Sequence, residues 1–175
     1  MNAYIFTLIV TSVDEDGLDA LYEAGCDDAT VGLGKWRSEV GFDREAPSLL
    51  DAILSAIADV ESTDATVLRV EPDPVVWAAA IAERMGRTRQ SVDMLIKGQR
   101  GPGGFPHPVS GNVLHPLWRW SEVEDWFARY TDYEPDRERS AVIGAINGAL
   151  EARRNVRASE DPKLASSVQQ LLAAS

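Results

Sequence analysis

The first 72 residues switch between strand-like and helix-like hydrophobic spacing. Clusters of β-branched and aromatic residues, or alternating apolar and polar positions, predict strands at residues 3–11, 29–36, 38–44 and 66–70. Helical spacing predicts a first helix that carries Leu18, Leu21 and Tyr22 and ends at Gly25. It predicts a second helix at residues 49–60, which begins after Ala46-Pro47-Ser48. This βαββαβ order is typical of a ferredoxin-like α+β domain, expected over residues 1–72, with two helices on one face of an antiparallel sheet.

Shorter elements follow in residues 73–131. We expect an alanine-rich helix at Val75–Met85, a break at Gly86, and a helix at Arg89–Lys97 with Thr88 as its N-cap. Gly98 ends that helix and a flexible, glycine-rich loop follows. A hairpin is then expected, with a strand at Phe105–Val109, a turn at Ser110-Gly111-Asn112, a return strand at Leu117–Trp120 and a closing helix capped by Ser121. These parts predict a winged helix-turn-helix domain.

The remaining residues, 132–175, are predicted to form a helical tail. Apolar positions within Ser140–Arg154 fit the stripe of one helix, and a final helix carries Leu164, Val168, Leu171 and Leu172. Between the first two domains, Glu71-Pro72-Asp73-Pro74 reads as a linker. The tail helices either cover the interface between the domains or pair with another copy of the chain, and packing within the chain is the default expectation.

Composition limits the class of protein. The 175 residues are 45% hydrophobic, which is enough for a folded core. No apolar run is long enough to span a bilayer, and the start lacks the features of a signal peptide, so we expect a soluble, cytoplasmic protein that has no membrane partner. The single cysteine, Cys26, excludes an internal disulfide framework.

The net charge of −11 is unevenly distributed along the chain. Residues 1–74 carry 16 acidic and 4 basic side chains, whereas residues 75–120 carry 2 acidic and 6 basic ones. Only the middle segment could therefore approach phosphates without strong repulsion. The acidic first domain is interpreted as a solvated surface or as a surface that masks a basic protein partner.

The helix expected at residues 89–97 has an apolar face and a polar one. Val92, Leu95 and Ile96 would be buried, which leaves the polar side chains to face a partner. Arg89, followed by Gln90, is the first choice for reading a base edge, most plausibly of guanine. The other candidate DNA contacts are phosphate contacts from the helix and its start, Arg87, Thr88, Ser91 and Lys97, and contacts from the loop and hairpin, Arg100, His107 and Arg119. Asp93 would weaken phosphate binding or accept a hydrogen bond from cytosine N4.

A family resemblance runs through the same segment, over about 50 of the 175 residues. It is carried by Gly86-Arg87-Thr88-Arg89-Gln90-Ser91-Val92, Ile96-Lys97-Gly98, Phe105-Pro106-His107-Pro108-Val109 and Leu117-Trp118-Arg119-Trp120-Ser121-Glu122-Val123-Glu124-Asp125-Trp126. These motifs resemble the excisionase/AlpA-like, MerR-type helix-turn-helix pattern, with its Ser/Thr-opened recognition helix and FPxP wing entry. The resemblance implies major-groove reading by Arg89 and Gln90 and backbone contact by the wing.

The first domain shows a weaker resemblance to HicB-like antitoxins, which join an N-terminal sheet module to a C-terminal DNA-binding domain. Its carriers are Tyr4, the acidic run Asp14-Glu15-Asp16-Gly17 and the helix at residues 49–60.

Other chemistry is poorly supported. Asp14–Asp16 are explained by helix capping, Asp27 and Asp28 match no calcium loop, and His107 and His115 lack a second pair of zinc ligands. We therefore expect no metal, no cofactor and no enzymatic activity. The tryptophans at positions 77, 118, 120 and 126 are interpreted as core residues, with a single exposed one as the alternative.

These observations favour a sequence-specific protein that binds double-stranded DNA, as a transcriptional regulator or a phage- or plasmid-type accessory factor. Dimerisation would help, since two half-sites share the required affinity. The alternative is an antitoxin-like or adaptor protein whose acidic domain binds a basic partner. A small-ligand sensor is a third possibility that no residue pattern specifically supports.

Overall fold

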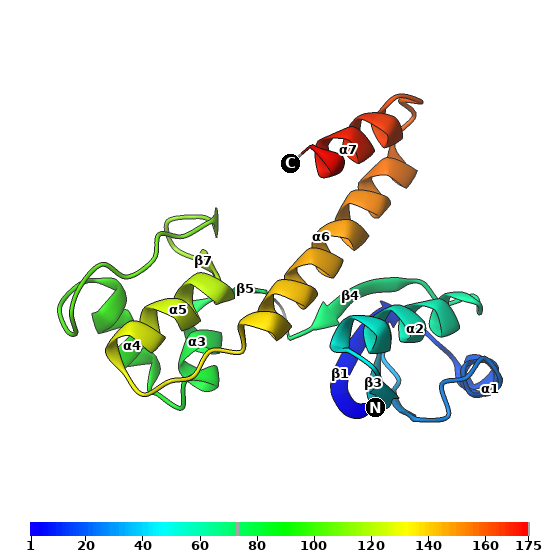
Figure 1. Ribbon diagram of the computed structural model, residues 1–175, viewed down its shortest axis with the longest axis horizontal. Helices are drawn as coiled ribbons and strands as arrows, with labels where there is room; N and C mark the ends of the chain where they lie inside the picture. The colour runs from blue at the N-terminus through cyan, green and yellow to red at the C-terminus, as the bar shows by residue number, and fades with distance from the viewer. Residues whose placement is uncertain (73, 175) are drawn as a thin grey trace. The chain divides into compact units, whose positions relative to one another are not determined.

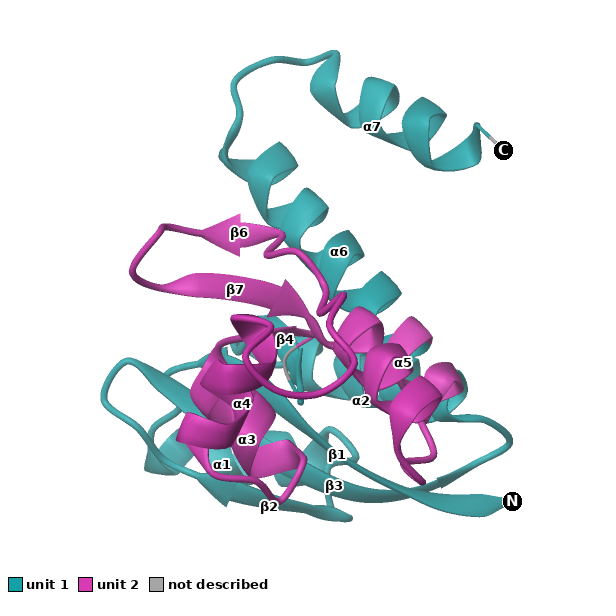
Figure 2. Ribbon diagram, turned by 90° about the vertical axis from the view of Figure 1, so that its left-hand side faces the viewer, with its two compact units in different colours: residues 1–72, 142–175 teal, residues 73–141 magenta. Residues whose placement is uncertain are grey.

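The chain divides into two compact units (Figures 1 and 2). Each unit has its own hydrophobic core, and the two cores share no residue. The computed structural model describes residues 1–72 and 74–174. Unit 1 consists of residues 1–72 and 142–175, and unit 2 of residues 73–141. Seven helices and antiparallel sheets lie in the described residues, which confirms the predicted α+β class. Asp73, in the expected linker, lies outside them.

Unit 1 contains a four-stranded antiparallel sheet with the strand order β2-β3-β1-β4. Its strands are β1 (Asn2–Thr11), β2 (Ala29–Gly32), β3 (Arg37–Ala46) and β4 (Val67–Glu71). The helix α1 (Glu15–Glu23) connects β1 to β2, and α2 (Leu49–Glu61) connects β3 to β4. The six elements thus follow the predicted βαββαβ order, with strand ends shifted by a few residues.

Alternation along β3 separates the core face of the sheet from an exposed face. Val40 and Phe42 are buried, as expected for residues that share one face, and the ring of Phe42 stacks on Phe6 at 5.3 Å between centroids. The inner face of α2 completes this core with Leu49, Ala52, Ile53, Ala56, Ile57 and Val60. Both helices begin at side-chain caps, because Asp14 accepts a hydrogen bond from the Gly17 N–H and Ser48 accepts one from the Asp51 N–H.

An arginine is also buried on the core face of β3. The guanidinium of Arg44 donates to both carboxylate oxygens of Asp28 at 2.8 and 2.9 Å, to Asp59 at 2.7 Å, to the Ser55 hydroxyl at 3.2 Å and to the Gly25 carbonyl at 2.9 Å. These hydrogen bonds raise its pKa above the usual arginine value, led by the bond to Asp28. The cluster joins β3 to α2 and to the turn that follows α1.

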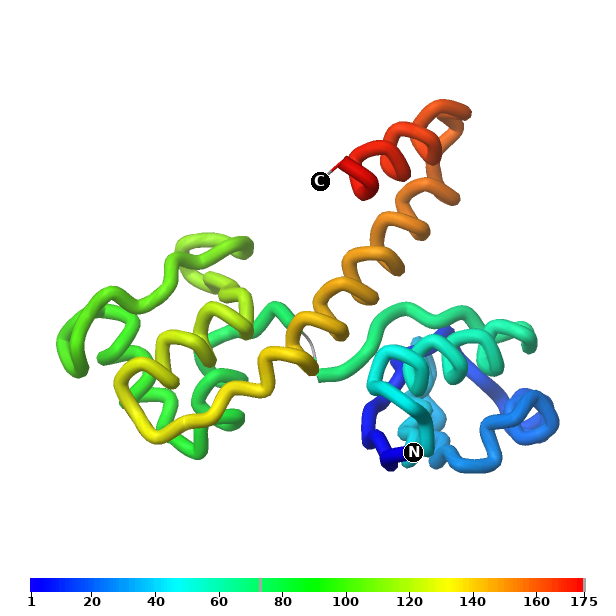
Figure 3. The backbone as a smooth tube through the Cα atoms, in the orientation of Figure 1, coloured from blue at the N-terminus to red at the C-terminus, as the bar shows by residue number. Residues whose placement is uncertain are grey.

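The tail packs partly onto unit 1. The helix α6 (Arg137–Ala158) adds Ile143, Ile146 and Leu150 to the first core. The side-chain amide of Asn147 accepts a hydrogen bond from the Val70 N–H at 2.7 Å and donates one to the Val70 carbonyl at 2.9 Å. The final helix α7 (Leu164–Ala173, red in Figure 3) has no buried residue, and its Leu171 and Leu172 are exposed.

Unit 2 contains three helices and a small sheet with the order β5-β7-β6. Its elements are β5 (Val75–Val76), α3 (Ala78–Arg84), α4 (Arg89–Ile96), β6 (Ser110–Gly111), β7 (Pro116–Arg119) and α5 (Trp120–Tyr130). The first residues of α6 follow. The core of this unit includes Val92 and Leu95 from α4, Phe127 from α5, and the three tryptophans Trp118, Trp120 and Trp126.

Three sequence expectations for unit 2 need correction. Val75 and Val76 form a strand paired with β7, so the alanine-rich helix starts only at Ala78. Phe105–Val109 is not a strand, and β6 begins at Ser110 with its turn at residues 112–115. The closing helix begins at Trp120, which places Arg119 and not Ser121 at the N-cap position, without a side-chain cap. In the described residues, every helix is too short or too polar to cross a membrane.

Candidate nucleic-acid interface

The turn between α3 and α4 is set by a glycine. Gly86 has φ +59°, a left-handed conformation that favours glycine over residues with a Cβ atom. The Gly86 N–H donates to the Glu83 carbonyl at 3.1 Å, and the Arg87 N–H donates to the Ala82 carbonyl at 2.8 Å. These two bonds end α3 and turn the chain into α4, as the break predicted at Gly86 requires.

The start of α4 agrees with the prediction in its cap and in its faces. Thr88 accepts a hydrogen bond from the Ser91 N–H at 3.2 Å. Val92 and Leu95 are buried, while Ile96 is only half-buried. The polar candidates divide into the exposed side chains Arg87, Thr88, Arg89, Gln90 and Lys97 and the half-buried side chains Ser91 and Asp93. The N-terminal turn of α4 is therefore accessible to a large partner.

The glycine-rich loop after α4 is held by aromatic residues of the core. The indole N–H of Trp126 donates to the Gly103 carbonyl at 3.0 Å, and that of Trp118 donates to the Pro106 carbonyl at 3.1 Å. The ring of Phe105 packs between them, 5.0 Å from Trp126 and 6.2 Å from Trp118 between centroids. The loop expected to be flexible is thus attached at three points, and Arg100 lies exposed near its start.

The tip of the β6–β7 hairpin is a hydrogen-bonded turn. The Asn112 N–H donates to the His115 carbonyl at 3.2 Å, and the His115 N–H donates to the Asn112 carbonyl at 3.1 Å. The side-chain oxygen of Asn112 also accepts from the Leu114 and His115 N–H groups, each at 2.9 Å. This turn places Val113 and Leu114 at the outermost point of the hairpin, where both are exposed.

A hollow of about 650 Å³ lies between the exposed face of α4 and this hairpin, and we call it the α4 hollow. It brings three of the candidate residues, Arg89, Asp93 and Lys97, together with hairpin residues 113–118. Trp77, at the start of α3, also lines it and is 61% exposed. The interpretation of Trp77 as a core residue is therefore wrong, whereas Trp118, Trp120 and Trp126 are buried as expected.

Sequence reasoning missed Trp77, Val113, Leu114 and His115 as lining residues of the α4 hollow. Trp77 had no local signal, because the extended backbone before it comes from the pairing of Val75 and Val76 with β7. Neighbouring side chains of a strand point to opposite faces, so Trp77 points outward from the buried Val76. The hairpin tip had no signal either, because its turn forms two residues later than the glycine of Ser110-Gly111-Asn112 suggests.

One hairpin candidate is paired with a carboxylate. The guanidinium of Arg119 is 3.6 Å from the Glu122 carboxylate in a partly exposed ion pair. His107 lines a different hollow, of about 570 Å³, whose charged lining residues are Glu122, Asp125, Arg129 and Arg137. Arg87 lies over the ring of Phe127, with 5.3 Å between the guanidinium carbon and the ring centroid. The structure therefore groups Arg89, Asp93 and Lys97 at the α4 hollow and places His107 at another one.

A buried carboxyl group lies in α5, outside the α4 hollow. Glu124 is 1% exposed, and burial raises its pKa, while the side chains of Ser140 and Trp120 act in the opposite direction. Burial and the adjacent Glu124 also raise the pKa of Tyr133. These groups support the core of unit 2 and do not line the α4 hollow.

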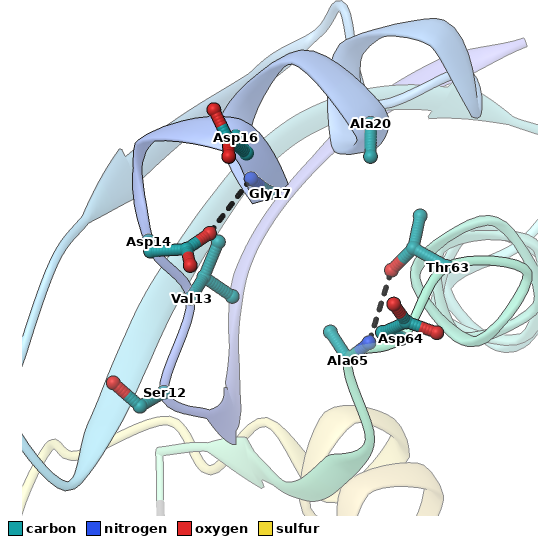
Figure 4. A pocket seen from close by; sticks show the side chains of 9 residues that line it. All are labelled: Ser12, Val13, Asp14, Asp16, Gly17, Ala20, Thr63, Asp64 and Ala65. Atoms are coloured by element: carbon teal, nitrogen blue, oxygen red, sulfur yellow. Dashed lines mark hydrogen bonds between the residues drawn. The ribbon is translucent and has the colours of Figure 1, made fainter.

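Unit 1 has a hollow of its own, of about 360 Å³, beside the start of α1 (Figure 4). Asp14, Asp16 and Asp64 line it, and Asp14 is engaged as the cap of α1 through the Gly17 N–H. Within residues 1–72 and 74–174, no cluster of histidine, cysteine and carboxylate side chains is arranged to hold a metal ion. Helix capping accounts for Asp14 in this hollow.

Comparison with known proteins gave no match, whether to a family model, to a curated protein or to a solved structure.

Proposed function

We propose that the chain is a sequence-specific double-stranded DNA-binding protein that reads the major groove with α4. The observation that carries this proposal is the exposed N-terminal turn of α4, which carries Arg89 and Gln90 and follows the exposed Arg87. A helix N-terminus favours phosphate through its dipole, and arginine and glutamine side chains can hydrogen-bond the edges of guanine and adenine. The local excess of basic residues in an acidic chain adds to this support.

The proposed domain is a winged helix-turn-helix. In it α3 and α4 are the two helices of the motif, and the β6–β7 hairpin is the wing. Arg89 and Gln90 would contact bases, while Arg87, Thr88, Ser91 and Lys97 would contact phosphates. Arg100, His107 and Arg119 remain candidate contacts of the loop and wing, although a phosphate would compete with Glu122 for Arg119. Asp93 would accept a hydrogen bond from cytosine N4 or limit phosphate binding.

We further propose that unit 1 is a ferredoxin-like module that serves dimerisation or partner binding. Its element order and its antiparallel strand order, β2-β3-β1-β4, support this assignment.

The test is a titration of the full-length chain against labelled genomic duplex fragments at low and moderate salt. We expect saturable binding that weakens steeply with salt, since phosphate contacts release counterions. Arg89→Ala should lose about 1–3 kcal/mol of binding free energy on preferred fragments and should relax their preference, because base contacts specify sequence.

Arg157→Ala is the matched control, because Arg157 is also exposed but belongs to unit 1, at the end of α6. The control should bind like the wild type. Absence of saturable binding, or equal binding by Arg89→Ala and the wild type, would reject the proposal.

The outer face of β3 favours a second function, binding of a basic protein partner by unit 1. Alternation along β3 places the exposed carboxylates of Glu39, Asp43 and Glu45 on this face, opposite the buried residues. Neutralising all three (E39Q, D43N and E45Q) should abolish co-purification of a stoichiometric basic partner from the native host. A partner retained by this triple variant would count against the carboxylate face.

A further inference from the structure

The two edges of the four-stranded sheet in unit 1 differ in how they are covered. At one edge, the side chain of Asn147 bonds both backbone groups of Val70 in β4. The other edge is β2, whose strand partner within the described residues is β3 on one side. An edge strand carries a row of unpaired N–H and carbonyl groups, and such a row is a template for a further strand.

The pairing of β2 with β3 decides which of its backbone groups face outward. The Asp43 N–H donates to the Asp28 carbonyl at 3.2 Å, so a hydrogen-bonded pair lies just before β2. Because such pairs alternate along an antiparallel ladder, Thr30 and Gly32 also bond β3, and Val31 directs its N–H and carbonyl away from it. In residues 1–72 and 74–174, no other segment supplies a backbone partner for these two groups of Val31.

A strand added beside β2 would send half of its side chains to the outer face of the sheet, which has an excess of carboxylates. Glu39 of β3 lies directly across from Gly32 of β2. Because Gly32 has no side chain, a lysine or arginine of the added strand can extend over it toward Glu39. The charged side chains on this face or beside it are Glu39, Asp43, Glu45 and Arg37 of β3, the ion pair of Arg69 and Glu71 on β4, and Lys35, which lies over the ring of Trp36.

The remaining side chains of an added strand would meet apolar residues on the core face. Ala29 and Val31 of β2 are half-buried against the first core. Leu33 and Trp36, which follow β2, are 50% and 82% exposed. Since neighbouring side chains of a strand point to opposite faces, the two faces together select a segment in which basic and apolar residues alternate.

We propose that an extended segment of a partner protein, with alternating basic and apolar residues, adds to β2 as a further strand of the sheet. Backbone hydrogen bonds to the open edge supply affinity, and the two faces supply specificity. A second copy fits this edge less well, because residues 1–74 carry 16 acidic and 4 basic side chains and two such sheets repel each other. This inference rests on the proposed binding of a basic partner by unit 1 and assigns the mode of that binding.

The first test presents the full-length chain with a pool of labelled peptides of about nine residues, in which lysine alternates with randomised apolar residues. Fluorescence anisotropy measures the affinity of a selected peptide. Two N-methylated forms of it are matched controls, one methylated at the lysine amides and the other at the amides of the apolar residues. Strand addition uses the N–H groups of one edge of the peptide, so one form should bind like the parent peptide and the other at least about tenfold more weakly.

The second test changes the chain itself. Val31→Pro removes the outward N–H and leaves the bonds to β3, and proline is tolerated on an edge strand where the N–H faces solvent. It should weaken the selected peptide about tenfold, whereas Val31→Ala retains the N–H and should bind close to the wild type. Far-UV circular dichroism checks that both variants fold. Glu39→Gln should weaken the peptide most at low salt, because its charge is then least screened.

The outcomes separate this inference from the proposal on which it rests. If no peptide of the pool binds, if both N-methylated forms bind alike, or if folded Val31→Pro keeps the affinity of the wild type, strand addition is rejected. Binding of a basic partner by the carboxylate face is then decided by the E39Q, D43N and E45Q triple variant alone. Equal binding by Glu39→Gln and the wild type would reject the basic character of the segment. Wild-type dimers in sedimentation that Val31→Pro dissociates would assign the edge to a second copy and would also reject the inference.

Discussion

Arg44 is a buried charge whose hydrogen-bonding capacity is fully used. A guanidinium has five N–H donors, and five hydrogen bonds connect Arg44 to Gly25, Asp28, Ser55 and Asp59. The guanidinium of Arg44 also lies over the ring of Phe42, with 4.7 Å between the guanidinium carbon and the ring centroid. Because its partners come from separate segments, this side chain determines how the turn after α1 meets β3 and α2.

Replacing Arg44 should destabilise unit 1 strongly. Arg44→Met leaves the carboxylates of Asp28 and Asp59 close together without the charge that compensates them. We expect a loss of about 3 kcal/mol in the free energy of unfolding, the lower end for a broken buried ion pair because both carboxylates are partly exposed. Urea unfolding followed by far-UV circular dichroism measures this loss.

Arg37→Met provides the control on the same strand, because Arg37 lies on the exposed face of β3. Its effect should stay within about 0.5 kcal/mol. Equal effects of the two substitutions would show that the Arg44 cluster does not stabilise the fold.

Sequence reasoning could have noticed Arg44 but could not have found its partners. Arg44 occupies the same phase of the alternation as Val40 and Phe42, which places an arginine on the buried face. Asp28 and Asp59 lie 16 and 15 residues away in different segments, so only the fold brings them together. Asp28, which matches no calcium loop, accepts hydrogen bonds from the Arg44 guanidinium.

At the scale of elements, hydrophobic periodicity predicted those helices and strands that depend on local sequence alone. The four strands and two helices of residues 1–72 follow from spacing and caps, and so does α4 with its cap at Thr88. The wrong predictions concern segments whose structure depends on pairing with a distant part of the chain. Val75 and Val76 pair with β7, some 40 residues further along the chain, and that pairing overrides the helical alanine run.

The hairpin illustrates a second physical reason for error. Proline has no N–H to donate to a strand ladder, so Pro106 and Pro108 cannot extend β6 backward. Val109 adds one ladder-like bond, from its N–H to the Leu117 carbonyl at 2.8 Å. The cap and the buried face of α4 were thus predicted well, and the hairpin was predicted poorly because its turn position depends on the Asn112 side chain.

Asn147 protects the edge of the larger sheet. β4 is an edge strand, and the Asn147 amide satisfies both backbone groups of Val70. Asn147→Ala should lower the free energy of unfolding by about 1–2 kcal/mol, because two backbone groups lose their partner. Chemical denaturation measures the change.

Asn155→Ala is the control for helix propensity, since Asn155 lies exposed on the same helix. It should be neutral or slightly stabilising. If Asn147→Ala changed the free energy of unfolding no more than Asn155→Ala does, water would be replacing the Asn147 amide without cost.

On the scale of the whole molecule, the two cores predict two separable unfolding transitions. Ile53 and Ile81 are each 0% exposed, one in each core. Trp77, Trp118, Trp120 and Trp126 belong to unit 2, while Trp36 of unit 1 is 82% exposed. Tryptophan fluorescence should therefore report mainly on unit 2.

Ile81→Val should lower the free energy of unfolding measured by tryptophan fluorescence, that of unit 2, by about 1 kcal/mol. Ile53→Val should instead lower the free energy of unfolding of unit 1, measured from the part of the circular dichroism change that does not accompany the fluorescence change. The two substitutions remove the same methylene and serve as controls for each other. Coincident transitions that move together in both variants would contradict independent cores.

Cys26 offers a chemical view of the same molecule. Burial, supported by the nearby Asp59, raises the pKa of this thiol from about 9 to about 11. A reagent that consumes thiolates would find almost none near neutral pH while unit 1 stays closed. The rate at which Cys26 is labelled would consequently measure how often the turn held by Arg44 opens.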